Sequence, residues 1–263
     1  MKNLKKLFIP NQSVDNKTTV GIFIFYSIFV GIFWMLNATS FFPNPFDLIG
    51  RAYKLFVFES LGQELLTSFI LSCSSMLIAV IFSLIVSYAS TIPAFRPIAF
   101  VFSKGRFNSL AGISIIFLLL FPQGFFFKVM ILSFSISLFF VTSMVSEILT
   151  IEKEYFTHAR TLGFSEWKVL YEVIILSKID KVFETIRQTY AISWMMIASV
   201  EGYFLGEGGV GSLMMRKGKY IQNLPDVIAI QIVILLLAIF QDQIILWFKN
   251  TIANWSTLKL ERK

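Results

Sequence analysis

Long uncharged, apolar stretches separated by short charged segments make up most of this chain. The four longest stretches without a charged residue are 18–46, 65–95, 107–127 and 129–146. A helix that crosses a lipid bilayer needs about 20 consecutive, mostly apolar residues. The apolar part of the first stretch covers residues 20–36, and the second stretch is centred on residues 77–86. The four stretches therefore predict four membrane-spanning helices.

Two further apolar stretches each contain one acidic residue. Glu201 interrupts residues 189–205, and Asp242 interrupts residues 227–248. Charged residues are costly within a membrane span, but they do occur there where they have a partner or a function. Both stretches are therefore still interpreted as spans. The sequence therefore predicts an all-α membrane protein with about six transmembrane helices, in which residues 19–248 form the transmembrane domain.

The first apolar stretch also has the outline of a secretory signal, because Lys2, Lys5 and Lys6 precede it. The apolar core of such a signal covers about 7–15 residues. This stretch is longer and contains the bulky residues Phe33 and Trp34. It is therefore interpreted as a retained membrane helix.

The composition also indicates a membrane protein. Of the 263 residues, 56% are hydrophobic and 15% are charged, and the mean hydropathy is +0.73. Charged residues make up about 25% of ordinary soluble domains. This composition excludes an intrinsically disordered chain, a coiled coil and a secreted domain held by disulfides, since Cys73 is the single cysteine.

Lysine and arginine are unevenly distributed between the predicted loops. If the N-terminus is cytoplasmic, 17 of the 23 basic residues lie in cytoplasmic segments. Basic residues are enriched on the cytoplasmic side of membrane proteins, so residues 1–18 and 249–263 are predicted to be cytoplasmic tails. Arg216, Lys217 and Lys219 are the exception, because they lie together on the predicted outer side. The net charge of +7 is accordingly attributed to topology and not to nucleic-acid binding.

The outer segment after the first span has the pattern of an amphipathic helix. It begins with Phe42-Pro43-Asn44-Pro45, in which Asn44 can cap a helix and Pro45 suits its first position. One face of the following helix would carry charged side chains and the other apolar side chains, namely Asp47, Arg51 and Lys54 against Phe46, Ile49, Tyr53 and Phe56. This pattern predicts a helix that lies in the membrane interface.

The longest predicted cytoplasmic loop covers residues 152–187, and residues 150–182 are assigned as the coupling loop of the transmembrane domain. It has the pattern of two short helices separated by a glycine. Gly163 suits the left-handed residue that ends a helix, and Ser165 suits the cap of the next one. Apolar residues then recur at helical spacing at Trp167, Leu170 and Val173-Ile174. A helix–turn–helix parallel to the membrane would offer its turn to a soluble partner.

This loop resembles the cytoplasmic signature of the integral membrane permeases of bacterial ABC importers with the type I importer fold. That signature is Glu-Ala-Ala, three residues, Gly, nine residues, then Ile-x-Leu-Pro. The chain has Thr157-His158-Ala159, three residues, Gly163, nine residues, then Val173-Ile174-Ile175-Leu176. The second alanine, the glycine and the hydrophobic end match, whereas the glutamate, the first alanine and the proline do not.

Three further stretches are similar to the nitrate/taurine/alkanesulfonate branch of the family. They are the Pro-Asn-Pro element at residues 43–45, the loop at residues 159–170, and Glu201 followed by Gly206-Glu207-Gly208-Gly209-Val210-Gly211-Ser212-Leu213. Asp242 lies where that branch often has an acid. The resemblance covers about residues 40–250.

The resemblance implies a permease subunit of a bacterial cytoplasmic (inner) membrane importer, multi-pass, with both termini cytoplasmic. The expected partners are a second permease chain in a homodimer, two ATPase subunits that bind ATP and Mg, an extracytoplasmic substrate-binding protein and membrane lipid. The residues implied in ATPase coupling are Glu154, Thr157, His158, Ala159, Gly163, Phe164 and Ser165. Those implied in translocation or gating are Ser193, Glu201, Gly209 and Gly211. Fold-level analogy suggests a small anion or a thiamine-precursor-like substrate.

The sequence offers no catalytic residue, no metal site and no cofactor site in this chain. The glycine-rich run at residues 206–211 is not followed by Gly-Lys-Ser/Thr, so it is not expected to bind a nucleotide. His158 is the single histidine, and either a helix-surface pair with Glu154 or a contact to the ATPase would explain it. Glu201 is either a gating residue or a structural one that reaches the interface or pairs with Arg216 or Lys217. An ion-driven secondary transporter and a multi-span membrane enzyme acting on lipid are the alternative functions.

Overall fold

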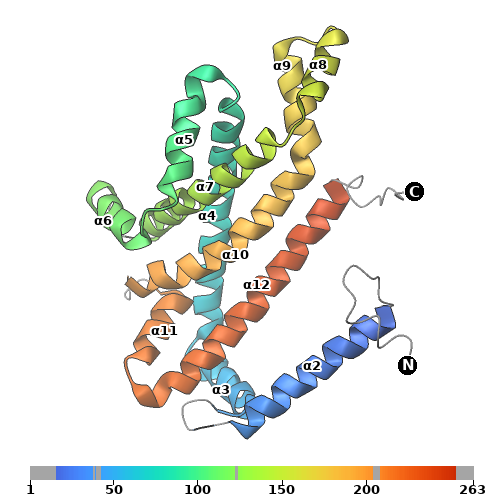
Figure 1. The fold of residues 1–263 in the computed structure, drawn as a ribbon. Helices are drawn as coiled ribbons and strands as arrows, with labels where there is room; N and C mark the ends of the chain where they lie inside the picture. The colour runs from blue at the N-terminus through green and yellow to red at the C-terminus, as the bar shows by residue number, and fades with distance from the viewer. Residues whose placement is uncertain (1–15, 38, 40–42, 122–123, 204–207, 253–263) are drawn as a thin grey trace.

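The computed structural model of the protein describes residues 16–37, 39, 43–121, 124–203 and 208–252, and throughout these ranges the regular structure is helical (Figure 1). The helices are α2 (Asn16–Leu36), α3 (Pro45–Phe58), α4 (Leu61–Ala89), α5 (Arg96–Gly105), α6 (Leu110–Leu120), α7 (Phe125–Leu149), α8 (Lys153–Thr161), α9 (Glu166–Val169), α10 (Ile179–Tyr203), α11 (Val210–Gly218) and α12 (Leu224–Ile252). Short 3-10 turns cover Pro93–Phe95, Leu176–Lys178 and Ile221–Asn223, and a π-helical turn covers Leu170–Ile175. The all-helical class is thus confirmed for these residues, while most of the two expected tails lies outside them.

Four helices are long and apolar enough to cross a membrane. They span Lys17–Leu36, Leu61–Ala89, Phe125–Leu149 and Ile221–Ile252. They correspond to the first, second, fourth and sixth predicted spans, and by length and composition they suit a multi-pass membrane protein.

The third and fifth predicted spans differ from this pattern. The stretch between Arg106 and Lys128 contains α6, which has 11 residues and is therefore about 17 Å long, too short for a hydrocarbon core of about 30 Å. α10 has 25 residues and is long enough, but its first half is charged. Lys128, expected to separate two spans, lies inside α7 and is only 2% exposed.

The core of the molecule is formed by α4, α7 and α10, which all pack against one another (Figure 1). Small hydroxyl side chains are buried in α4 and α7, namely Ser68, Ser72, Ser75, Ser83 and Ser87 on α4 and Ser133, Ser135 and Ser137 on α7. The Ser133 hydroxyl donates a hydrogen bond to the Ser75 carbonyl at 3.1 Å. Small residues let helix backbones approach closely, and such packing drives helix association where lipid removes the hydrophobic effect.

The two ends of this core carry different short helices. α8 and α9 lie at one end, and α3 and α11 lie at the opposite end (Figure 1). α3 packs on α12, and its Leu48 and Leu55 are buried, while its aromatic residues such as Phe46 and Tyr53 are exposed. The expected amphipathic helix is therefore present and starts at Pro45, although Asn44 makes no side-chain cap.

α2 stands apart from the other helices in Figure 1. None of its candidate spanning window is buried. Its Trp34 indole donates to the Pro43 carbonyl at 3.1 Å and thereby connects the end of α2 to the start of α3.

Candidate functional site

The turn between α8 and α9 is a Schellman motif centred on Gly163. The Phe164 amide donates to the Ala159 carbonyl at 3.2 Å, and the Gly163 amide donates to the Arg160 carbonyl at 2.9 Å. Gly163 has φ +78°, the left-handed conformation that glycine adopts without steric cost. The Ser165 hydroxyl then accepts from the Lys168 amide and caps α9. Both local predictions for this loop, the left-handed glycine and the serine cap, are confirmed.

An ion pair joins the two helices across this turn. The Arg160 guanidinium donates to both Glu166 oxygens, at 2.8 and 3.1 Å. This hydrogen bonding holds the pKa of Glu166 below its ordinary value and raises the pKa of Arg160. Both side chains are exposed, so the pair links the two helices but contributes little to the stability of the fold.

Most of the seven residues expected to contact an ATPase lie on the free surface of this helix–turn–helix (residues 153–169). Ala159 is buried and Phe164 is partly buried; Glu154, Thr157, His158, Gly163 and Ser165 are exposed. The apolar side of α9 differs from the expected one, because Trp167 is 71% exposed while Val169 is buried.

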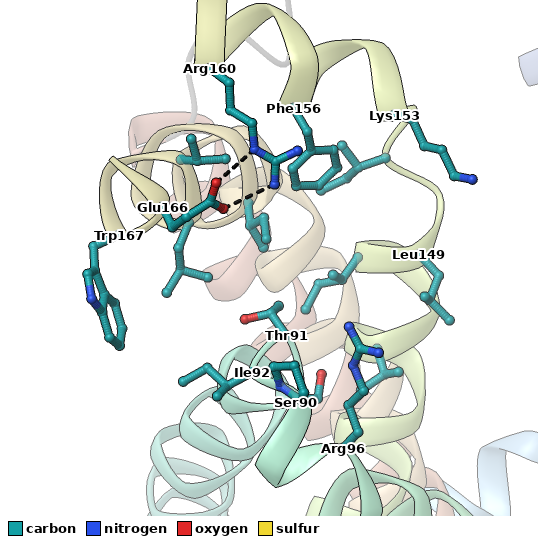
Figure 2. A pocket seen from close by; sticks show the side chains of 17 residues that line it. Ser90, Thr91, Ile92, Arg96, Leu149, Lys153, Phe156, Arg160, Glu166 and Trp167 are labelled. Atoms are coloured by element: carbon teal, nitrogen blue, oxygen red, sulfur yellow. Dashed lines mark hydrogen bonds and ion pairs between the residues drawn. The ribbon is translucent and has the colours of Figure 1, made fainter. Parts of the chain in front are cut away.

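A hollow of about 930 Å³ separates the helix–turn–helix from the body of the molecule (Figure 2). Its wall on one side is the connection after α4 with Arg96, and on the other side it is α8 and α9. In Figure 2 Arg160 and Arg96 point into the space from opposite sides, and Arg160 is already bound to Glu166. We call this space the turn hollow.

A second group of polar residues is buried at the opposite end of the molecule. Glu201 is fully buried, and its carboxylate accepts from the Ser68 hydroxyl at 2.7 and 2.8 Å and from the Gly211 amide at 2.9 Å. The Ser68 oxygen in turn accepts from the Val210 amide at 2.9 Å. The Glu64 carboxylate accepts from the Gly209 amide. Two acids thus hold the start of α11 through its backbone amides, and we call Glu64, Ser68, Glu201, Gly209 and Gly211 the glycine-loop cluster.

Glycine is required at residues 209 and 211 because there is no room for a side chain. A Cβ on Gly209 would overlap the Glu201 carboxylate, and one on Gly211 would overlap the Ala198 carbonyl. Gly209 also has φ +100°. Lys128 lies nearby, with its amine 3.4 Å from the Gly208 carbonyl. The cluster therefore joins α4, α10 and α11 at one point, and Lys128 adds a contact from α7.

Three of the four residues implied in gating meet in this cluster, and the fourth does not. Ser193 is buried two turns earlier in α10 and donates to the Tyr190 carbonyl at 2.7 Å. Of the glycine-rich run, residues 206 and 207 lie outside the described part of the chain. Within the described part, no three His, Cys, Asp or Glu side chains gather in a way that could hold a metal ion.

Two of the three basic residues on the predicted outer side, Arg216 and Lys217, have carboxylates close by. Arg216 donates to Glu64 at 2.9 Å, and Lys217 pairs with Glu59 and lies 3.7 Å from Asp226. The pairing of Glu201 with Arg216 or Lys217, one of the two structural explanations for this acid, is therefore not the arrangement found. The Gly211 amide and the Ser68 hydroxyl bind Glu201 instead.

Asp242 is part of an ionic ladder between α10 and α12. The Arg187 guanidinium donates to both of its oxygens at 2.8 Å, and Lys249 donates to Glu184 at 3.0 Å one turn further on. The Trp194 indole donates to the Gln241 oxygen at 2.8 Å on the same interface. The charge in the last span thus has a structural partner.

The sequence alone did not indicate Glu64, Ser68 and Lys128 as partners in the glycine-loop cluster. Glu64 and Ser68 are one helical turn apart at the start of the second span, so they share a helix face, and that spacing is the one available signal. Compared with known proteins, the chain matches no protein-family model, and no curated protein is significantly similar to it. The function is therefore argued from the site.

Proposed function

We propose that this chain is the permease subunit of an ATP-binding-cassette importer of the type I fold, which forms half of a solute pathway and couples it to separate ATPases. The observation that carries the proposal is the helix–turn–helix at one end of the α4–α7–α10 core, with its turn at Gly163 exposed (Figure 1). Its rigid Schellman turn and its ion pair suit a part that transmits motion between two bodies. The signature-like sequence of the same residues supports this assignment.

Six spans follow if α10 and the α5–α6 pair cross the membrane in addition to the four long apolar helices. The charged first half of α10 is compatible with a span because Arg187 and Glu184 pair with residues of α12. α5 packs on α7, and a Cβ on Gly105 would lie 2.9 Å from Leu138 in the middle of α7. The helix–turn–helix would then be cytoplasmic and α3 and α11 would face outward.

A polar hollow of about 290 Å³ between α7 and α10 is a candidate section of the solute pathway. Arg106 and Lys181 line it together with hydroxyl and amide groups. The two acids in it, Glu147 and Glu184, each pair with a lysine outside it. The resulting surplus of positive charge fits a small anionic solute.

The glycine-loop cluster is proposed to form part of the outer gate. Glu201 and Glu64 hold the start of α11 by backbone hydrogen bonds, so a shift of α10 against α4 would move this segment. Alternating access requires such coupled helix shifts.

Assembly and topology are tested together. The tagged chain, expressed with its candidate ATPase, should retain the ATPase and a second permease chain through purification. In a Cys73→Ser background, Ser165→Cys should resist an impermeant thiol reagent in intact cells and Lys54→Cys should react, because both native side chains are exposed on opposite sides. Outside labelling of Ser165→Cys, or transport by a lone chain without any ATPase, contradicts the proposal.

An ion-driven secondary transporter is the second candidate, and the buried carboxylate of Glu201 favours it, because intramembrane acids often serve ion pathways. The two functions differ in their energy source. Uptake that collapses with the membrane potential while ATP is retained would favour the secondary transporter; uptake that follows ATP would favour the importer.

A further inference from the structure

We propose that the turn hollow binds an anionic phospholipid of the leaflet at that end of the membrane helices. The inference requires only the membrane-spanning helices and not the importer function. It is carried by the position, the shape and the charge of the hollow.

The hollow lies at the level at which two membrane helices end. Ser90 follows the last residue of α4, and Leu149 is the last residue of α7; both line the hollow. Both helices are long and apolar enough to cross a membrane, so their ends mark the head-group region. Trp167, 71% exposed, lies at the same level on the hollow's edge (Figure 2), as expected for an aromatic side chain at a membrane interface.

The shape suits an amphiphile. The walls contributed by the end of α7 and by the segment after α9 are apolar, with Val145, Ile148 and Ile174 among them. A volume of about 930 Å³ lies at the upper end of the range of about 300–1,000 Å³ for small-molecule sites. An inorganic phosphate would leave most of this space and all of its apolar wall unused.

The charge selects an anion. The charged residues that line the hollow are three basic ones, Arg96, Lys153 and Arg160, and one acid, Glu166. Glu166 binds both guanidinium donors of Arg160 and so neutralises that residue. Arg96 points into the hollow, whereas Lys153 lies at its edge with its side chain directed outward (Figure 2). Both remain as positive charges near an apolar wall, a combination that binds acidic lipid head groups.

The two basic residues can be removed without disturbing the fold, because both are exposed. The test variant is Arg96→Gln with Lys153→Gln. The matched control is Lys104→Gln with Lys168→Gln, which removes two charges from α5 and α9 outside the hollow. Each purified chain is mixed in detergent with equal amounts of phosphatidylglycerol and phosphatidylcholine, and the retained lipids are counted by native mass spectrometry.

Wild type and the control should retain phosphatidylglycerol in preference to phosphatidylcholine. The test variant should lose about fivefold in retention for each basic residue removed, about 25-fold in total. Val145→Trp, which fills the apolar wall and leaves every charge in place, should also lose the lipid. Unchanged retention by either variant overturns the proposal.

Two other occupants are separated by the same measurement. If millimolar glycerol phosphate displaces the phosphatidylglycerol, the site binds a free phosphate group, and the lipid proposal is refuted. If a purified ATPase partner strips the lipid from the wild-type chain, the hollow is part of a protein interface and the lipid is likewise refuted. Retention in the presence of both competitors supports the lipid site.

Discussion

Substitution of Gly163 separates a backbone requirement from a packing requirement at the turn between α8 and α9. A Cβ at this position would meet no atom within 4 Å, yet φ is +78°. Any loss on substitution must therefore come from the backbone conformation itself. Asparagine tolerates this region, alanine does not, and a β-branched residue tolerates it least.

The expected cost follows from that conformation. A left-handed residue other than glycine or asparagine costs about 1–2 kcal/mol, and valine costs up to about 3 kcal/mol. The chain can relieve this strain by breaking the two turn hydrogen bonds of Gly163 and Phe164, each of which contributes about 0.5–1.5 kcal/mol. α8 has 9 residues and α9 has 4, too few to be stable alone. We therefore expect Gly163→Val to unwind the turn and leave the rest of the core folded.

On the importer proposal, the assay is performed in proteoliposomes that contain the chain together with the candidate ATPase and the candidate binding protein. Transport and substrate-stimulated ATP hydrolysis should fall in the order Asn, Ala, Val, with Gly163→Val at least tenfold below wild type, since about 1.4 kcal/mol is a factor of ten. Gly218→Val is the matched control, because that glycine is also unobstructed and its φ is not positive.

Equal activity of the Asn, Ala and Val variants would refute the reasoning, because it would show that the turn tolerates strain or is not needed for coupling. A fall in melting temperature that matches the fall in activity would also contradict it. In that case the glycine would be needed for the stability of the core and not for the transmission of motion.

Three further predictions concern the ion pairs and the buried acid. Glu201→Ala should lower the melting temperature in detergent, since each buried group left without its partner costs about 1–3 kcal/mol. Glu201→Gln should lower the melting temperature less, and equal effects of the two variants would contradict the hydrogen-bond network. Asp242→Asn should cost about 1–3 kcal/mol, between exposed and buried pairs, and exchange of Asp242 and Arg187 should restore part of it; no rescue would show that the pair is not the cause. The Glu166 carboxyl, titrated by carbon-13 NMR, should have a pKa below its ordinary value, and this pKa should rise in Arg160→Gln. The contribution of the pair to stability is therefore complete at neutral pH and is lost as the pH falls through the lowered pKa. An identical titration in Arg160→Gln would refute the contact.

The sequence predicted those parts of the fold that depend on local pattern. The long apolar helices, the amphipathic α3 and the turn at Gly163 all depend on residues within a few positions of each other. The end of α6 at Leu120 was not predicted, because residues 107–127 are uncharged throughout and satisfy the length criterion. Pro122 and Gly124, which follow soon after it in the sequence, are the visible signs that the helix does not continue.

The glycine-loop cluster was predicted in part, for a physical reason. The need for glycine near an acid is visible in residues 201–211, but Ser68 is 133 positions from Glu201, and a single sequence does not encode such a pairing locally. Lys128 shows the same limit. A buried lysine in a span looks like a boundary until its partner is known, and here its amine lies near the Gly208 carbonyl.

The basic residues of α11 show that membrane insertion and folding use the same charges differently. The orientation of a span follows the number of nearby lysines and arginines, and acids contribute little to it. Arg216 and Lys217 therefore count against the proposed orientation during insertion. In the folded chain they pair with Glu64 and Glu59, which come from another hairpin and are available only after the spans have packed. The larger number of basic residues at the opposite end of the spans can thus set the proposed orientation. In the folded structure the charges of Arg216 and Lys217 are neutralised by their acidic partners, and the Arg216–Glu64 pair joins α11 to α4.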